Sequence, residues 1–298
     1  MKESYKNIFE KDNSCISIGN FDGFHKGHKK LIDVLNYEAK NKGLKSIVLT
    51  FTPNPKIFFR REKYLISTDK QKKELLTANG VNRIVFLDFN EIYQMDGRDF
   101  LKKILIDRLK MKVLVIGKEF GFGKNRSLNH NNLLELSKEF HFRLIIVEPE
   151  FIGENKISSS YIRNLLFNGK IQEANALLVN RFFIDGVVVK GSQRGRKLGF
   201  PTINIKTENT LLPNGVFKTI THIDNDAYLS ITNIGFIPTF NREFAEKRIE
   251  TYILNFNKEI YGENVKIEFL KKIRDEYKFE TEKELVERIK KDVSSLVS

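Results

Sequence analysis

The chain has 298 residues, one cysteine, no Trp and a formal net charge of +13. This length favours two domains, each large enough to bury its own core. A single cysteine excludes a disulfide scaffold, and no apolar run is long enough to cross a bilayer. Because the first 15 residues also lack the apolar core of a signal peptide, we expect a cytoplasmic protein.

The basic charge is spread along the whole chain. Lysines alternate with Glu and Asp, as in "EKELVERIKKD", and no block of like charges stands apart. This pattern is typical of a solvated basic surface. It leaves open three partners that carry negative charge: a nucleic acid, an acidic membrane surface, or a small substrate rich in phosphate.

The first part of the chain alternates between two kinds of hydrophobic pattern. Helical spacing occurs between its short apolar runs, for example at Leu31, Leu35 and Ala39, and again at Leu101, Ile104, Leu105 and Leu109. The alternation predicts an α/β domain with a doubly wound parallel sheet, whose ligands bind at the carboxyl ends of the strands. The runs that predict its strands are 15–18, 46–51, 83–87, 112–116 and 143–147.

After about residue 180 the pattern changes to strands separated by Gly, Pro, Asn and Asp turns. It predicts a small antiparallel β-barrel followed by an amphipathic C-terminal helix over 281–296. We therefore expect two domains, 1–180 and 181–298. The segments that predict the barrel strands are "RFFIDGVVVKG", "PTINIK", "GVFKTITHID", "DAYLSITNIG", "RIETYILNF" and "NVKIEFLKKI".

The stretch "IGNFDGFHKGHKKLI" (18–32) lies where the first strand should give way to a helix. A strand end, flexible glycines and a helix N-terminus together form an anion site, because backbone N–H groups and the positive helix end point at the ligand. Residues three apart share one helical face, so His25 and His28 can address the same group.

The histidine pair also admits other interpretations. A metal site needs a third ligand, and the other histidines, His130, His141 and His222, stand in no motif with ligand spacing. The Rossmann dinucleotide fingerprint is absent, and "GFGKNRS" (121–127) lacks the spacing of a P-loop. Two exposed histidines without a function remain an alternative when the pair is considered alone.

The string "GNFDGFHKGH" matches the H-x-G-H signature of nucleotidyltransferases, and "SIGNFDGFHKGHKKLI" resembles the prokaryotic bifunctional riboflavin kinase and FAD synthetase family. The segments "TFTPNPKIFF" (50–59), "IGKEFGFGKNRS" (116–127) and "ISSSYIR" (157–163) fall where that family carries further motifs. The resemblance implies an adenylyltransferase domain in which His25 and His28 are catalytic and hold ATP phosphates. It implies nucleotide binding by Gly19, Phe21, Asp22, Gly23, Gly117, Ser158, Ser160 and Arg163, and flavin binding by Asn54, Pro55, Glu119 and Phe120.

The chain departs from the family pattern at several positions. Glu119 stands where Asn or Asp is usual, Ser160 replaces Thr, and Leu128 and Asn129 replace a Gly-Asp pair. The junction "LLVNRF" (177–182) lacks the expected Gly-Arg-Pro. Ser160 keeps the hydroxyl, whereas Glu119 adds a methylene at a possible ligand contact and puts the rate or affinity of adenylylation in doubt.

In the second module, "GSQRGRKLGFPTINI" (191–205) is by itself only a Gly- and Arg-rich loop, compatible with a flexible hairpin or an RNA contact. The string G-x-x-x-G-F-P-T-x-N within it resembles the signature of riboflavin kinases. Kinase chemistry needs Mg²⁺ on the phosphates and a base for the hydroxyl, and Thr202 and Asn204 can supply oxygen ligands from one face of a strand. The resemblance implies that Glu250 is the base, that Gly191, Gly195, Lys197, Gly199 and Pro201 bind nucleotide, and that Arg274 touches flavin or phosphate.

The motifs keep the family order over almost the whole chain. They imply a bifunctional enzyme that makes FMN from riboflavin and ATP in the barrel, and FAD from FMN and ATP in the α/β domain, with Mg²⁺ in both steps. One alternative is a riboflavin kinase with an impaired adenylyl domain; another is a basic nucleic-acid-binding protein built on the barrel. For the enzyme we expect small-molecule substrates, no nucleic acid, no membrane, and a monomer or weak homo-oligomer.

Overall fold

A computed structural model describes residues 2–123, 127–191, 195, 198–236, 247–277 and 279–297. The chain divides into two compact units, Met1–Ser159 and Ser160–Ser298, and each is considered by itself. The predicted Lys197 lies outside the described residues. None of the described helices is long and apolar enough to span a bilayer.

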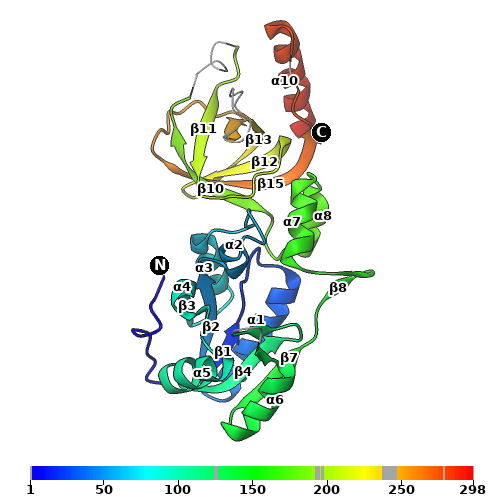
Figure 1. The fold of residues 1–298 in the computed structure, drawn as a ribbon. Helices are drawn as coiled ribbons and strands as arrows, with labels where there is room; N and C mark the ends of the chain where they lie inside the picture. Colours follow the sequence, from blue (N-terminus) through cyan, green and yellow to red (C-terminus); the bar gives the residue numbers. More distant parts are fainter. Residues whose placement is uncertain are drawn as a thin grey trace. The chain divides into compact units, whose positions relative to one another are not determined.

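The first unit is built on a five-stranded parallel sheet in the order β3-β2-β1-β4-β7 (Figure 1). These strands are β1 (Ser14–Ile18), β2 (Lys45–Thr52), β3 (Arg83–Asp88), β4 (Met111–Gly117) and β7 (Arg143–Val147). All five were predicted from their apolar runs. The order reverses between β1 and β4, so the carboxyl ends of these two neighbouring strands form the switch point at which doubly wound sheets bind ligands.

Helices cover both faces of the sheet, and the strands alternate between two apolar clusters. Ile16 of β1 packs in one cluster with Leu101 and Leu133, whereas the preceding Cys15 packs in the other with Leu35 and Leu76. The connecting helices are α1 (Lys26–Asn41), α2 (Pro55–Phe58), α3 (Asp69–Ala78), α4 (Phe89–Ile92), α5 (Gly97–Asp99), η1 (Phe100–Arg108) and α6 (His130–Glu139). The doubly wound fold is confirmed.

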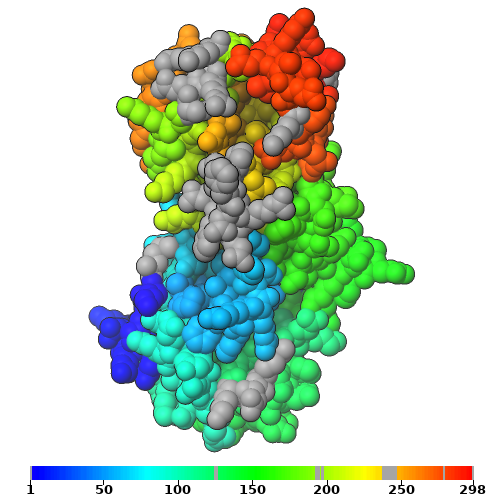
Figure 2. All heavy atoms as spheres, turned by 45° about the horizontal axis from the view of Figure 1, so that its top comes forward, coloured from blue at the N-terminus to red at the C-terminus, as the bar shows by residue number. Residues whose placement is uncertain are grey.

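Two features of this unit were not predicted. The segment with Leu101, Ile104 and Leu105 was expected to be an ordinary helix, but η1 is a π-helix, and the Leu109 N–H donates to the Ile104 carbonyl. Short strand pairs also lie in the loops: β5 (Gly121–Phe122) with β6 (Leu128–Asn129), and β8 (Phe151–Ile152) with β9 (Asn155–Lys156). The second pair forms a projecting hairpin after β7 (Figure 1), which also stands out in the space-filling view (Figure 2).

The second unit is a closed antiparallel barrel in the order β10-β11-β14-β13-β12-β15. All six barrel strands were predicted, but their nonlocal pairing was not. Inside the barrel, five fully buried hydroxyl side chains form a connected hydrogen-bond chain: Thr221, Ser230, Thr219, Thr232 and Thr251. The strands are β10 (Phe183–Val189), β11 (Thr202–Thr207), β12 (Gly215–Ile223), β13 (Asp226–Phe236), β14 (Lys247–Ile253) and β15 (Asn264–Arg274).

The helices of this unit among the described residues are α7 (Ser159–Phe167), α8 (Ile171–Leu177) and α10 (Glu282–Val297). The Asn175 side chain ties α8 to the barrel, because its amide donates to the Phe269 carbonyl at 2.8 Å and its oxygen accepts from the Phe182 N–H at 2.8 Å. Helix α10 packs Leu296 against Val216 and Ile231. The predicted barrel with a C-terminal helix is confirmed.

Candidate active sites

The histidine pair lies at the N-terminus of α1, directly after β1. His25 is the N-cap residue, and its Nδ1 accepts a hydrogen bond from the His28 backbone N–H at 3.2 Å. The two imidazole rings stack, with centroids 3.6 Å apart and planes inclined by 16°. A Cβ on Gly27 would stand 3.3 Å from the His25 ring, so glycine leaves the rings room at this position. The sequence thus builds a stacked pair where the helix dipole favours an anion.

Both imidazoles are neutral near pH 7. Burial lowers the pKa of His25 to about 4, and the positive charge of Lys156 acts in the same direction. Burial also holds the pKa of His28 well below its ordinary value, and the neighbouring His25 adds to the effect. His28 Nδ1 is buried without a hydrogen-bond partner among the described residues. A negatively charged ligand beside the pair would favour the protonated form of the rings, and the interaction between ligand and rings would then become stronger.

The loop between β1 and the histidine pair is held in place by hydrogen bonds and packing within the protein. The carboxylate of Asp22 accepts hydrogen bonds from the backbone N–H groups of Ile66 and Ser67, at 2.8 and 3.0 Å. Gly23 has φ of +63°, and a Cβ there would come within 2.7 Å of Ile66. Phe21, also at positive φ, is buried with its ring 5.1 Å from that of His28. These residues therefore shape the loop, and Gly19 leads into it from β1.

The loop after β4 reaches the same switch point. Gly117 ends β4, and a Cβ there would meet open space, so this strand end has room beside it. Phe120 closes a turn by donating its N–H to the Gly117 carbonyl at 2.9 Å, and its ring packs on the core. The exposed Glu119 forms an ion pair with Lys156 of β9. This partner of Glu119 was not predicted.

The remaining predicted residues of the adenylyl site lie on two other segments. Asn54 is a buried N-cap of α2, where its side-chain oxygen accepts from the Lys56 N–H at 2.9 Å, and Pro55 is the first residue of that helix. Ser158 precedes α7. Ser160 and the buried Arg163 lie in α7, within the second compact unit. Their role in ligand binding stays a prediction.

The barrel aligns three polar side chains across neighbouring strands. Glu250 of β14 is in register with Asn204 of β11 on one side and with Asn233 of β13 on the other. Directly opposed residues of antiparallel strands share a face, and Thr202 shares it too, two residues before Asn204. Glu250 also lies 3.6 Å from the Arg248 guanidinium. The predicted base and the two predicted metal ligands are thus brought together.

Two glycines of the glycine-rich loop pack closely on these residues. A Cβ on Gly191 would come within 2.1 Å of the Asn204 amide nitrogen, so only glycine fits beside that side chain. A Cβ on Gly195 would stand 2.3 Å from the Phe200 carbonyl oxygen and 3.4 Å from the Thr202 hydroxyl. Gly199 has φ of +84°, a conformation that glycine adopts without strain. The described part of the loop is thus fitted to Thr202 and Asn204.

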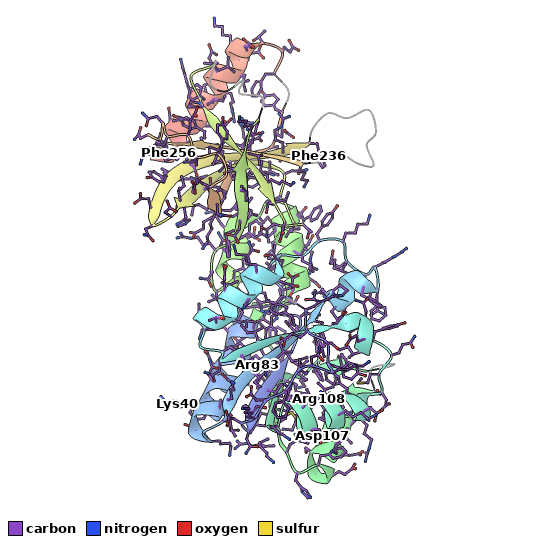
Figure 3. All side chains as sticks on the ribbon, turned by 90° about the vertical axis from the view of Figure 1, so that its left-hand side faces the viewer. Lys40, Arg83, Asp107, Arg108, Phe236 and Phe256 are labelled. Carbon is purple, nitrogen blue, oxygen red and sulfur yellow. The ribbon has the colours of Figure 1, made fainter. Side chains whose placement is uncertain are left out.

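A cavity of about 200 Å³ opens beside this loop. Pro201 and Thr202 form one side, and the loop after β14 forms another with Phe256, Lys258 and Tyr261. Figure 3 shows Phe256 on the opposite side of the barrel from Phe236. The residues of the β14–β15 loop were not predicted. The signal was present in "FNKEIYG", an aromatic and polar segment between two strands.

Arg274 forms an ion pair within the barrel unit. Its guanidinium forms an ion pair with the buried Asp292 of α10 at 2.8 Å, and its Nε donates to the same carboxylate at 3.0 Å. This contact fastens the C-terminal helix to β15. A role of Arg274 toward flavin or phosphate stays a prediction.

The fold and sites define a two-module protein: a nucleotidyltransferase-type α/β unit, followed by a barrel of the riboflavin kinase type. The family profile of FAD synthetase matches residues 8–161, and that of riboflavin kinase matches residues 178–297. The chain belongs to the bifunctional riboflavin kinase/FMN adenylyltransferase family. The predicted family is confirmed, and the chain carries both enzyme domains.

Several known proteins are similar over nearly the full length. The bifunctional riboflavin kinase/FMN adenylyltransferase of Buchnera aphidicola (from Acyrthosiphon pisum) is 36% identical, covering 94% of this chain and 91% of its own. That of Bacillus subtilis is 35% identical over 95% and 91%. A crystal structure from Streptococcus pneumoniae, titled a macrolide-efflux protein, is 30% identical, with a TM-score of 0.89 and coverage of 100% and 99%. From that structure we take the fold alone.

Proposed function

We propose that the chain catalyses two successive steps of flavin cofactor synthesis, riboflavin and ATP to FMN and ADP, then FMN and ATP to FAD and pyrophosphate. The observation that supports the proposal is that each compact unit brings polar side chains of its own together, the stacked His25–His28 pair in one and the paired Asn204 and Glu250 in the other. We assign adenylyl transfer to 1–180 and kinase activity to 181–298. The basic charge suits these polyanionic substrates.

In the kinase step, Glu250 takes the proton of the ribityl 5′-hydroxyl as its oxygen attacks the γ-phosphorus of ATP. The bond between the γ-phosphorus and the β–γ bridging oxygen breaks, and ADP leaves. We propose that Gly191, Gly195, Gly199 and Pro201 bind the nucleotide, with its base toward the cavity beside Pro201. Lys197, which lies outside the described residues, is a further predicted nucleotide-binding residue. Arg274, the last residue of β15, contacts the flavin or a phosphate.

Thr202 and Asn204 suit Mg²⁺. They offer a hydroxyl and an amide oxygen on one strand face, in register with a carboxylate, and the Asn204 side chain packs directly against Gly191, where a Cβ would clash with it. When bound, Mg²⁺ neutralises phosphate charge. Among the described residues, no group of three or more His, Cys, Asp or Glu side chains is arranged to hold a metal by itself. Phosphate oxygens and water would then complete the coordination.

In the adenylyl step, an FMN phosphate oxygen attacks the α-phosphorus of ATP, and the bond between the α-phosphorus and the α–β bridging oxygen breaks to release pyrophosphate. The protein supplies position and charge rather than a nucleophile. His25 and His28 donate hydrogen bonds to the phosphates. The other nucleotide-binding residues of this site are Gly19, Phe21, Asp22, Gly23, Gly117, Ser158, Ser160 and Arg163. Asn54, Pro55, Glu119 and Phe120 contact the flavin.

We further propose a cytoplasmic enzyme that is a monomer or weak homo-oligomer and needs no nucleic acid or membrane. The test is an incubation of the full chain with riboflavin, ATP and Mg²⁺, beside one started from FMN, with the flavins separated by chromatography. FAD in both incubations is the expected result. FMN without FAD in either would support the alternative, a riboflavin kinase with an impaired adenylyl domain, and no conversion at all would refute both activities.

A further inference from the structure

The start of α3 contacts two segments that carry predicted ligand-binding residues. Ser67 lies just before the helix, and its hydroxyl accepts a hydrogen bond at 3.1 Å from the N–H of Gly23, in the loop between β1 and the histidine pair. Asp69 is the first residue of α3, and its carboxylate accepts a hydrogen bond from the Thr52 hydroxyl at 2.6 Å. One helix start is therefore hydrogen-bonded both to the loop after β1 and to the end of β2.

Thr52 stands directly before the segment that is predicted to bind flavin. It is the last residue of β2, and residues 53–55 follow it, including the buried Asn54 that caps α2. At the other end of α2, the Phe58 ring packs on that of Phe89, with centroids 5.2 Å apart. The hydrogen bond of Thr52 thus fixes the near end of the segment, and the aromatic contact fixes its far end.

The carboxylate of Asp69 is itself anchored by a buried cation. Lys72 lies three residues further along α3, with its ammonium 3.4 Å from one oxygen of Asp69 and 5.7 Å from the centroid of the Phe86 ring. The side chain of Lys72 is 2% exposed, and a buried ammonium is costly unless a negative charge lies beside it. Lys72 therefore holds the carboxylate where its other oxygen accepts from Thr52. Hydrogen bonds to an ionised acceptor are stronger than those between neutral groups.

From these contacts we propose that Asp69 is a positioning residue of the adenylyl site: through the Thr52 hydroxyl it holds residues 53–55 in the arrangement that binds the flavin of FMN. The inference rests on the proposed adenylyltransferase function. Neither Asp69 nor Lys72 touches the substrate. Loss of the contact should weaken the use of FMN more than that of ATP, because the loop after β1 is held separately, through Asp22 and Ser67.

The test measures FAD formation by the full chain from FMN and ATP, with each substrate varied in turn. Thr52→Val removes the hydroxyl and keeps the shape of the side chain. It should raise the KM for FMN by about 3-fold to 10-fold, the effect of losing one hydrogen bond that orients the site, and leave the KM for ATP within about twofold. Thr52→Ser keeps the hydroxyl and should retain the wild-type KM for FMN.

Asp69→Ala should raise the KM for FMN at least as much, and Thr52→Val added to it should raise the KM no further, because the two residues act through one contact. Asp69→Ala leaves a buried ammonium without its carboxylate. If this change alone unfolds the chain, Asp69→Ala combined with Lys72→Met removes the unpaired charge as well and should raise the KM for FMN in the same way.

The matched control is Asp99→Ala. Asp99 is also a helical residue whose carboxylate pairs with a lysine one turn further along, Lys103 at 3.0 Å, but its side chain is 52% exposed. It should leave both KM values unchanged.

Hydrogen exchange of peptides covering residues 53–59 measures the positioning without turnover. These peptides should exchange faster in Thr52→Val and Asp69→Ala than in wild type, and at the wild-type rate in Asp99→Ala. Equal exchange in all four proteins, an unchanged KM for FMN in Thr52→Val, or equal rises of both KM values would overturn this inference. A wild-type chain that makes no FAD from FMN would instead contradict the proposed function.

Discussion

Replacing His25 by Asn should make the first unit less sensitive to acid. Asn is a good N-cap residue, so it can accept the hydrogen bond from His28 and preserve the start of α1, while it removes the titrating ring. In the folded chain, burial lowers the pKa of His25 to about 4, against 6.5 for the ordinary imidazole. The unfolded state therefore binds more protons between these values, and the stability that this group provides is lost as the pH falls.

The magnitude follows from the two pKa values. Between pH 7 and pH 5, the wild-type unit should lose about 2 kcal/mol more stability than His25→Asn. His28 still titrates in the variant, so its own contribution to the acid sensitivity remains in both proteins. Urea titrations at the two pH values would measure the difference, with hydrogen exchange of peptides from β1 and α1 reporting the unfolding of this unit alone. Parallel losses in wild type and variant would refute the assignment of a neutral, buried His25.

Further changes at the metal site, the histidine pair and the barrel interior test other parts of the account. Chelation of Mg²⁺ should stop both FMN and FAD formation. Asn204→Ala should raise the Mg²⁺ concentration that is needed for FMN formation, but not the concentration needed for FAD formation. An unchanged Mg²⁺ dependence would contradict the assignment of Asn204 to the metal site. Gly27→Ala should lower FAD formation by about tenfold because its Cβ presses on the His25 ring, with FMN formation unaffected; equal FAD rates would contradict this. Thr232→Val should lower the free energy of unfolding by about 2 kcal/mol, because it leaves the buried Thr251 hydroxyl unpaired. The double variant with Thr251→Val should lose less stability than the sum of the two single variants, as measured by hydrogen exchange of β13. Additive losses would contradict the hydrogen-bond chain inside the barrel.

Most of the fold follows from local patterns in the sequence. The parallel sheet could be predicted from five apolar runs separated by segments with helical spacing. Its strands are continuous apolar runs because they are buried on both faces, as Cys15 and Ile16 illustrate in β1. The barrel strands were found through their turn residues. The order in which they pair around the barrel was not predicted, because the pairing of β10 with β15 joins segments far apart in the chain, and alternation alone does not specify a partner.

The candidate sites divide in the same way. His25 and His28 were recognisable because their spacing and glycines form one short motif, and the structure adds their stacking. Glu119 could be identified as unusual, but its partner Lys156 could not, since a contact between two loops depends on the packing of β4 and the β8–β9 hairpin. The cavity wall formed by Phe256 and Tyr261 was missed because no motif had drawn attention to this loop.

The central claim is that one chain carries two separate active sites, and complementation between two variants tests it directly. Glu250→Gln should lower FMN formation by about 10²–10⁴-fold and still convert supplied FMN to FAD. His28→Asn should make FMN from riboflavin but little FAD. Given riboflavin, ATP and Mg²⁺, each variant alone should yield little FAD, and a mixture of the two should yield FAD, because FMN released by one is used by the other. A mixture of folded variants that still makes no FAD, or loss of both activities from either single change, would contradict the account.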